Sequence, residues 1–370
     1  MKTKHYNRIL LVSESDSPNL GDKLISELVF KLCKDQNLEV VQYPISKGRR
    51  YFIVKAIYKI SALLRAMSIY DYAVRVMTKI CIKNKIDNNT VVIFSGGQMF
   101  INYFIDPILA ILKHAKKKNA KVIFNACGSG VINDKYKERL KKSLHGCDVS
   151  LRDNVDAFKA IHNEAYYRPD IAVATSQILS INNRKSENPT IGWGVINTNT
   201  YNFWNKDVNL TDEDYINSAS KAISQLTEMG YLVEIFTTGD PFDYVLAEKL
   251  YNSIKQSNAV SICDFPTTTN DLIRQIYNFD FVVASRMHAL IISYSYNIPY
   301  IALKWEQKII DFARQTQCEN RVYDIAKLDE IDWVNSIKDL KSVGLNQELR
   351  KCLINRSIQG VKEVTNTIIN

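Results

Sequence analysis

Short apolar runs alternate with longer amphipathic stretches along most of this chain of 370 residues. The alternation is typical of a parallel β-sheet covered by helices, in which each helix carries the chain back to begin the next strand. A polar stretch over residues 181–189 interrupts the pattern, which then restarts. The sequence therefore predicts an α/β fold of two doubly wound Rossmann-like domains that face a cleft, with ligands bound outside the carboxyl ends of the strands.

The predicted elements place the domain boundaries. We expect an N-terminal Rossmann-like domain over residues 1–182 with a basic helical segment at 47–85, a linker at 183–189, a C-terminal Rossmann-like domain over 190–345 and a last helix over 346–370. In the first domain, strands are predicted at 8–13, 38–43, 91–95, 121–126 and 149–152, and helices at 20–34, 106–118 and 134–144. In the second, strands are predicted at 190–195, 231–237, 260–263, 281–285 and 300–303, and a helix at 212–229.

The formal net charge of +9 is concentrated in one segment. Residues 47–85 contain ten Lys and Arg side chains and one acid, so the rest of the chain is balanced. Apolar residues recur there at helical spacing, and a basic amphipathic helix can lie on an anionic membrane. The side chains expected to contact the membrane surface or a lipid diphosphate are Lys47, Arg49, Arg50, Lys55 and Lys59. The alternative is that the apolar stripe packs on the core and the charges are solvated.

Composition narrows the location and the partners. No run of about 18 uncharged apolar residues is present, so no helix is expected to span a bilayer. The apolar run at residues 9–12 is too short for a signal peptide. We expect a cytoplasmic protein bound peripherally at the inner face of the cytoplasmic membrane. Nucleic acid is not an expected partner, because the basic segment matches no nucleic-acid-binding module.

Two strand ends in the first domain carry charged residues suited to ligand binding. Segment 19–22, Asn-Leu-Gly-Asp, follows the first strand and opens a helix, where free N–H groups suit an anion or a polar sugar group. The alternative is that Asp22 only caps the helix. Arg152 ends the fifth strand, where a guanidinium can clamp an anion. The alternative for Arg152 is a surface pair with Asp153 or Asp156.

Glycines mark two further turns of the first domain. Gly96 and Gly97, followed by Gln98, end the third strand and let the backbone approach a ligand, unless they form an ordinary turn. Segment 128–130, Gly-Ser-Gly, begins like a dinucleotide fingerprint, but Asn133 replaces the third glycine. No nicotinamide or flavin cofactor is therefore expected. Because the His and Cys residues lack zinc-type spacing, no metal is expected either.

The second domain contains the sharpest local signal. Segment 285–288, Ser-Arg-Met-His, follows a fully apolar strand and leads into an apolar helix. It places Arg286 and His288 at the carboxyl edge of the sheet, and His is the natural acid or base near neutral pH. Lys308, after the next strand, adds a cation. The alternatives are a satisfied core histidine and a solvated helix start. We expect the remaining histidines to lie in polar, solvated surroundings: His5, His114, His145 and His162.

Taken in order, these segments resemble the polysaccharide pyruvyl transferase family over about residues 8–315. The motifs are Asn19-Leu20-Gly21-Asp22, Gly96-Gly97, Leu151-Arg152-Asp153, Arg168-Pro169-Asp170-Ile171-Ala172, Ser285-Arg286-Met287-His288-Ala289-Leu290 and Lys308. Three positions depart from the family pattern: Ser95 and Ala289 stand where glycine is usual, and Lys308 alone matches a Tyr-Asp-Pro-Lys-like stretch.

The resemblance implies a GT-B-like fold and transfer of pyruvate from phosphoenolpyruvate to two hydroxyls of one sugar as a ketal. It implies a glycan acceptor, which we expect to be a polyprenyl-diphosphate-linked precursor of exopolysaccharide or capsule. On this hypothesis, His288 is the acid/base, and Arg286, Arg152 and Lys308 bind the donor with Gly96 and Gly97, while Asn19, Asp22 and Gln98 contact the acceptor. Two alternatives remain open: a GT-B glycosyltransferase using a nucleotide sugar, and a non-catalytic protein that binds a membrane surface or lipid-linked glycan.

Overall fold

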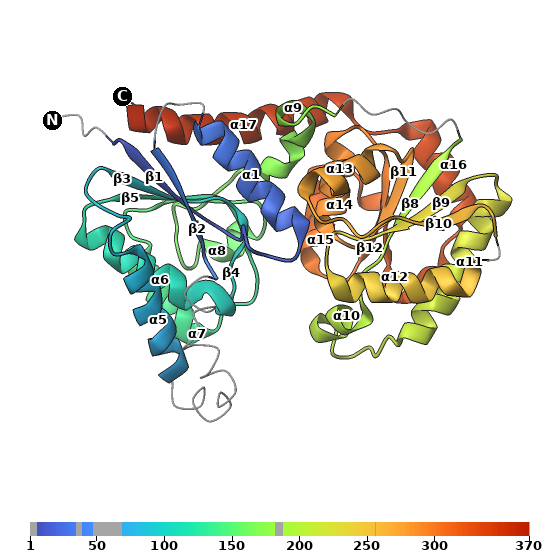
Figure 1. Ribbon diagram of the computed structural model, residues 1–370, viewed down its shortest axis with the longest axis horizontal. Coiled ribbons are helices and arrows are strands. Elements are labelled where there is room, and N and C mark those ends of the chain that lie inside the picture. The colour runs from blue at the N-terminus through green and yellow to red at the C-terminus, as the bar shows by residue number, and fades with distance from the viewer. Residues whose placement is uncertain (1–5, 35–38, 47–68, 182–187, 256, 370) are drawn as a thin grey trace. The chain divides into compact units, whose positions relative to one another are not determined.

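The computed structural model describes residues 6–34, 39–46, 69–181, 188–255 and 257–369 (Figure 1). The chain forms two compact units, each with its own parallel sheet. The first unit contains Met1–Ser17, Asp22–Ile171 and Asn355–Asn370, and the second contains Pro18–Gly21 and Ala172–Ile354. The predicted fold class, two parallel α/β domains, is confirmed.

The first unit is built on a seven-stranded sheet in the order β2-β1-β3-β5-β6-β7, with β4 paired to β5. Every pairing in it is parallel. The strands are β1 (Arg8–Ser13), β2 (Glu39–Pro44), β3 (Thr90–Phe94), β4 (Gly97–Phe100), β5 (Lys121–Ser129), β6 (Asp148–Leu151) and β7 (Tyr166–Tyr167). The helices are α1 (Leu20–Lys34), α5 (Ile69–Ile82), α6 (Asn102–Lys117), α7 (Asp134–Ser143) and α8 (Val155–Phe158).

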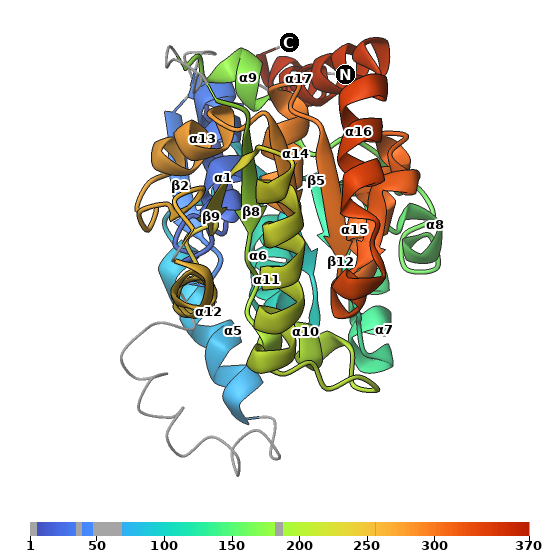
Figure 2. The ribbon, with the colours of Figure 1, turned by 90° about the vertical axis from the view of Figure 1, so that its right-hand side faces the viewer.

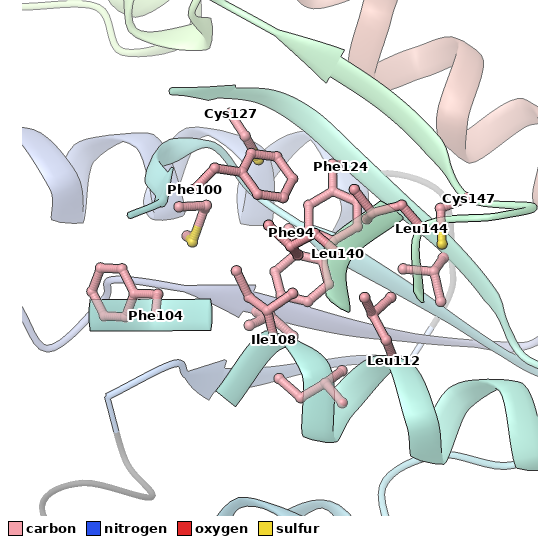
Figure 3. Packing of buried hydrophobic residues seen from close by; sticks show 14 of the residues in the cluster. Phe94, Phe100, Phe104, Ile108, Leu112, Phe124, Cys127, Leu140, Leu144 and Cys147 are labelled. Carbon is pink, nitrogen blue, oxygen red and sulfur yellow. The ribbon is translucent and has the colours of Figure 1, made fainter. Parts of the chain in front are cut away.

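Apolar side chains of strands and helices form the core of the first unit. All five residues of β3 are buried, because α1 and the group α5, α6 and α7 cover opposite faces of the sheet (Figure 1). Figure 3 shows Phe94 of β3 against Phe124 of β5, with Ile108 and Leu112 of α6 in the same cluster. The two Phe rings stack with centroids 4.1 Å apart. Each such buried side chain contributes about 2 kcal/mol.

The second unit has a six-stranded parallel sheet in the order β10-β9-β8-β11-β12-β13. The strands are β8 (Thr190–Gly194), β9 (Leu232–Phe236), β10 (Val260–Ile262), β11 (Phe281–Ala284), β12 (Tyr300–Lys304) and β13 (Val322–Asp324). The helices are α9 (Thr175–Ile178), α10 (Thr198–Trp204), α11 (Asp212–Glu228), α12 (Pro241–Ile254), α13 (Thr269–Tyr277), α14 (Met287–Ser295), α15 (Gln307–Gln315) and α16 (Trp333–Val343), with 3₁₀ turns at Ile171–Ala174, Glu319–Arg321 and Ile325–Glu330. The last helix, α17 (Gln347–Ile369), belongs to the second unit up to Ile354 and to the first unit from Asn355.

Local sequence sets where several of these helices begin. Thr211 caps α11 in a capping box with Asp214, and Asp240 caps α12 directly before Pro241, whose fixed φ suits the first helical turn. Helix α11 packs against α16 (Figure 2), and Trp333 of α16 reaches the ring of Trp193 in β8, with centroids 5.3 Å apart. These helices cover the second sheet and leave the loops at its strand ends to carry the site.

The predicted strands and helices agree with the structure to within a few residues. The prediction missed β4, β7 and β13, which have four, two and three residues. The predicted linker falls mainly at 182–187, and the membrane-contact residues Lys47, Arg49, Arg50, Lys55 and Lys59 fall at 47–68; both ranges lie outside the described residues. Among the helices that the structure describes, none is long and apolar enough to cross a bilayer.

Candidate functional site

The carboxyl edge of the second sheet collects the polar residues of four strand ends. Strands β9 and β11 lie on opposite sides of β8. The chain therefore proceeds from β8 toward one edge of the sheet and, from β11, toward the other edge, so the strand order reverses between β8 and β11. A parallel sheet offers a natural ligand site where its strand order reverses. The loops there begin at Val195, Thr237, Ser285 and Trp305. The reversal therefore gathers the two motifs of the second domain at one edge.

Arg286 lies directly before α14, and two carboxylates hold its guanidinium. Its Nε and Nη2 donate to the two oxygens of Asp243 at 2.7 and 2.8 Å, and Nη2 also donates to Asp240 at 3.1 Å. Asp243 is fully buried and accepts further hydrogen bonds from the backbone N and the Nδ2 of Asn197, at 2.9 and 2.8 Å. The ends of β8, β9 and β11 are thus joined through one carboxylate.

This arrangement changes the interpretation of Arg286. A guanidinium beside two carboxylates has a positive charge that is already compensated, so it attracts a donor anion less strongly than an unpaired Arg. Its contact with the donor remains a prediction. Asp240 and Asp243 were not predicted from the sequence, although Thr-Thr-Gly-Asp at 237–240 follows an apolar strand in the same way as the recognised motifs.

His288 lies in the first turn of α14 and is 5% exposed. The backbone of Gly21 packs directly against its ring: a Cβ at position 21 would lie 2.2 Å from both Cγ and Nδ1 of the imidazole. No residue with a side chain fits at position 21 without displacing His288. The structure therefore brings together two motifs that are more than 260 residues apart in the sequence.

Hydrogen bonds fix the segment that carries Gly21. The Asn19 side chain accepts from the backbone N of Gly21 at 3.0 Å, and the backbone N of Leu20 donates to the carbonyl of Thr238 at 2.9 Å. Leu20 also packs against Gly239, whose φ of +94° and lack of a side chain admit it. Asn19 was predicted to contact the acceptor; in this structure its side chain orders the turn beside His288.

The tip of β12 is tied to the tip of β11 by Trp305. Its indole Nε1 donates to the carbonyl of Ser285 at 2.7 Å. The Lys308 ammonium lies 4.7 Å from the centre of the Trp305 ring and pairs with Glu306 at 2.6 Å. Lys308 is thus brought to the same edge as His288 and Arg286. Its contact with the donor stays a prediction.

The Ser285 hydroxyl is an unsatisfied group at this edge. Its Oγ is buried and has no hydrogen-bond partner among the described residues, and the same holds for the hydroxyls of Thr237 and Thr238. A buried hydroxyl without a partner costs stability. Hydroxyls and the N–H groups at the positive end of α14 can donate hydrogen bonds to a phosphate or carboxylate.

The first unit places its predicted residues at the carboxyl edge of its own sheet. Gly96 and Gly97 have φ of +115° and +80°, which a residue with a side chain rarely adopts. A Cβ at Gly97 would lie 3.2 Å from Glu14 and 3.9 Å from Asp22. Asp22 accepts a hydrogen bond from Ser17 at 3.3 Å. The Gln98 side chain, which is half-buried, lies against Gly130.

Arg152 is buried rather than presented at the surface. Its Nη1 donates to Asp170 at 2.5 Å, and its Nε lies 3.5 Å from Asp153. Burial alone would lower the pKa of Arg152, but these two carboxylates raise it, so the group stays charged. The alternative interpretation from the sequence was an ion pair at the surface with Asp153 or Asp156. The pair with Asp153 is present, but both side chains are buried. The structure also joins two of the motifs, 151–153 and 168–172, through Arg152 and Asp170.

The family of this chain follows from its match to a sequence model. A sequence model of the family "Polysaccharide pyruvyl transferase" matches residues 19–307, which is more than half of the chain. The chain belongs to the polysaccharide pyruvyl transferase family. The match begins at Asn19 and ends one residue before Lys308. It therefore includes both motifs that meet at His288.

Solved structures agree on the fold of this pyruvyl transferase family member. The UDP-GlcNAc 2-epimerase of Methanocaldococcus jannaschii is similar with a TM-score of 0.63 and 9% identity, covering 97% of this chain and 99% of that one. The S. aureus MnaA structure with UDP has a TM-score of 0.60 and 11% identity, covering 98% and 96%. A glycosyltransferase from Rickettsia africae has a TM-score of 0.52 and 12% sequence identity, and the match covers 98% of this chain and 96% of that one. These identities show the GT-B fold alone. No curated protein matches the chain in sequence.

The structure corrects the expectation for two histidines. His114 and His162 are 8% and 7% exposed, not solvated. Burial lowers the pKa of each below the ordinary value of 6.5, and nearby lysines lower that of His114 further. Each lies on a helix or turn whose neighbours in sequence are polar, which is why the local pattern was misleading.

Proposed function

We propose that this family member transfers the pyruvyl group of phosphoenolpyruvate to two hydroxyls of one sugar in a glycan. The methylene carbon of phosphoenolpyruvate takes up a proton and becomes a methyl group, leaving an oxocarbenium-like centre at the neighbouring carbon. One sugar hydroxyl adds to that centre, the C–O bond to phosphate breaks, and a second hydroxyl closes the ketal. The two sugar hydroxyls lose two protons. One of them replaces the proton taken up by the methylene carbon, and the other protonates the released phosphate.

His288 supplies the proton in this proposal. The observation that carries it is the contact between Gly21 and the imidazole, because it holds the ring in one place at the edge where the strand order reverses. A general acid acts only when it is held within hydrogen-bond reach of the reacting atom. The family motif around His288 and the motif around Gly21 are therefore one structural unit.

The donor has a phosphate and a carboxylate, which need several hydrogen-bond donors. We assign them to Arg286, Lys308, the Ser285 hydroxyl and the first turn of α14. Arg286 is anchored by Asp243, which orients its fork of donors. Arg152, with Gly96 and Gly97, remains assigned to the donor as well, although Asp170 and Asp153 compensate its charge.

The acceptor in this proposal is a sugar of a polysaccharide or of its polyprenyl-diphosphate-linked precursor at the inner face of the cytoplasmic membrane. Asp22 and Gln98 are the assigned contacts in the first unit, and both lie at the carboxyl edge of its sheet beside Gly97 or Gly130. Asn19 supports the site through Gly21. No metal or cofactor takes part in the proposed reaction, since protonation and addition need only acid–base groups and cations.

A nucleotide-sugar glycosyltransferase is the second candidate, because the similar structures include a glycosyltransferase and a UDP complex. Thermal unfolding in the presence of phosphoenolpyruvate or UDP separates the two. We expect phosphoenolpyruvate to raise the melting temperature of wild type, and Arg286→Ala to weaken that effect more than Arg286→Lys. Stabilisation by UDP and not by phosphoenolpyruvate would favour the glycosyltransferase.

A further inference from the structure

Three helices of the first unit line an open groove of about 830 Å³ that no step of the proposed reaction uses. It lies between α5, α6 and α7, which run side by side in Figure 1. We call it the basic groove and define it by its cationic lining residues. These are Lys79, Lys113, Lys116, Lys117 and Lys142, with Arg75 and Arg139.

The basic groove has a large excess of positive charge. Its five lysines are exposed and form no ion pair with any residue that the structure describes. The two arginines share Asp106, which is fully buried beneath them, with Nη–Oδ distances of 2.5 and 3.2 Å. Tyr136 donates to the same carboxylate at 2.7 Å. Because no acidic side chain lines the groove itself, its lysines are open to an external anion.

Apolar side chains are exposed on α5, one of the three helices that line the basic groove. Tyr72, Val76 and Ile80 follow one another at a spacing of four along α5, so they lie on one face. They are 63%, 36% and 60% exposed. Tyr72 and Val76 also line the basic groove. An apolar stripe beside a group of lysines is the arrangement by which an amphipathic helix lies in the interface of an anionic bilayer.

We propose that the basic groove and the Tyr72–Val76–Ile80 stripe bind the surface of a membrane that contains anionic phospholipid. The lysines would contact phosphate headgroups while the stripe enters the boundary with the acyl chains. A soluble polyanion or a nucleic acid could use the lysines but would have no use for Val76 and Ile80. The inference does not depend on the donor or on the identity of the reaction.

Vesicle sedimentation tests this proposal without phosphoenolpyruvate or acceptor. The probes are vesicles of phosphatidylcholine, with and without phosphatidylglycerol. We expect wild type to bind only the anionic vesicles, and binding to weaken as salt rises and shortens the Debye length from about 10 Å at 0.1 M. Each lysine near such a surface contributes about fivefold to binding at moderate salt. A variant with Gln at Lys113, Lys116, Lys117 and Lys142 should therefore bind about 600-fold more weakly.

A matched control removes the same charge elsewhere. Lys338, Lys341, Lys351 and Lys362 are exposed on α16 and α17, and their replacement by Gln should leave most of the binding intact. Equal loss in both variants would mean that net charge alone drives attachment, and the basic groove would be excluded as the site. Circular dichroism and melting temperatures confirm that both variants fold.

Two further results would overturn the proposal. If wild type ignores anionic vesicles but binds inorganic pyrophosphate or single-stranded RNA, and the groove variant does not, the groove serves a soluble polyanion or RNA. If Tyr72→Ser with Ile80→Ser binds vesicles like wild type at every salt concentration, the stripe takes no part. Turnover of a short soluble acceptor should stay unchanged in the groove variant, so failure here is distinct from failure of the proposed reaction.

Discussion

The imidazole of His288 packs against the backbone of Gly21, and the proposed reaction uses this ring as the acid. His288→Gln should lower turnover by about 100-fold or more, since the variant cannot supply the proton. Steady-state phosphate release measures this, with the melting temperature as a check on folding. Turnover near that of wild type would remove His288 from the reaction.

Gly21→Ala tests the positioning separately. The added methyl would lie 2.2 Å from the imidazole, so the ring or the turn must move. We expect kcat to fall by about tenfold or more while the KM for phosphoenolpyruvate changes little, because a displaced acid affects the chemical step. Gly230→Ala is the control: its surroundings are open, and its φ of +87° makes the substitution cost about 1 kcal/mol of stability. An equal fall in kcat in both variants would contradict the assigned role of Gly21.

Single residues also mark the limit of sequence reasoning. The motif residues Arg286 and Arg152 were found from the sequence, and Asp153 was named as a possible partner of Arg152. The pairings of Arg286 with Asp243 and of Arg152 with Asp170 were not predicted. A partner in an ion pair can come from any strand end, and no local pattern tells which one. The sequence could therefore predict the type of group at each strand tip but not whether its charge was already compensated.

At the scale of elements, one buried carboxylate joins the ends of β8, β9 and β11. Asp243→Asn keeps the shape of the side chain but removes its charge and leaves Arg286 and Asn197 with poorer acceptors. Breaking a buried pair of this kind costs about 3 kcal/mol. We expect a lower free energy of unfolding and a higher KM for phosphoenolpyruvate. Asp240→Asn, at a more exposed partner, should have a smaller effect; a larger effect than Asp243→Asn would contradict this account.

The buried histidines of the first unit predict how its stability depends on pH. Burial favours their neutral form, so the unfolded chain takes up protons near pH 6.5 while the folded chain does not. Stability is therefore present above about pH 6.5 and is lost as the pH falls toward the lowered pKa values. His114→Gln with His162→Gln should flatten the fall in melting temperature between about pH 7 and 5.5. The exposed His145→Gln is the control, and an unchanged profile in the double variant would exclude this cause.

The elements themselves were largely predictable because buried parallel strands are continuous apolar runs. Strands such as β3 and β11 are buried along their whole length and so are visible in the sequence. The missed strands β4, β7 and β13 are too short to form a run, and tertiary pairing with β5, β6 and β12 creates them. Pairing between distant segments is the part of the fold that periodicity does not report.

For the whole molecule, family membership and the two-sheet fold agree, while the donor and acceptor are proposed. The direct test incubates the protein with phosphoenolpyruvate and a panel of lipid-linked oligosaccharides, and measures inorganic phosphate and acceptor mass together. The account predicts one phosphate released for each acceptor that gains the mass of pyruvate less one water, with His288→Gln lacking both signals. Absence of phosphate release with every acceptor, together with sugar transfer from a UDP-sugar, would contradict the account.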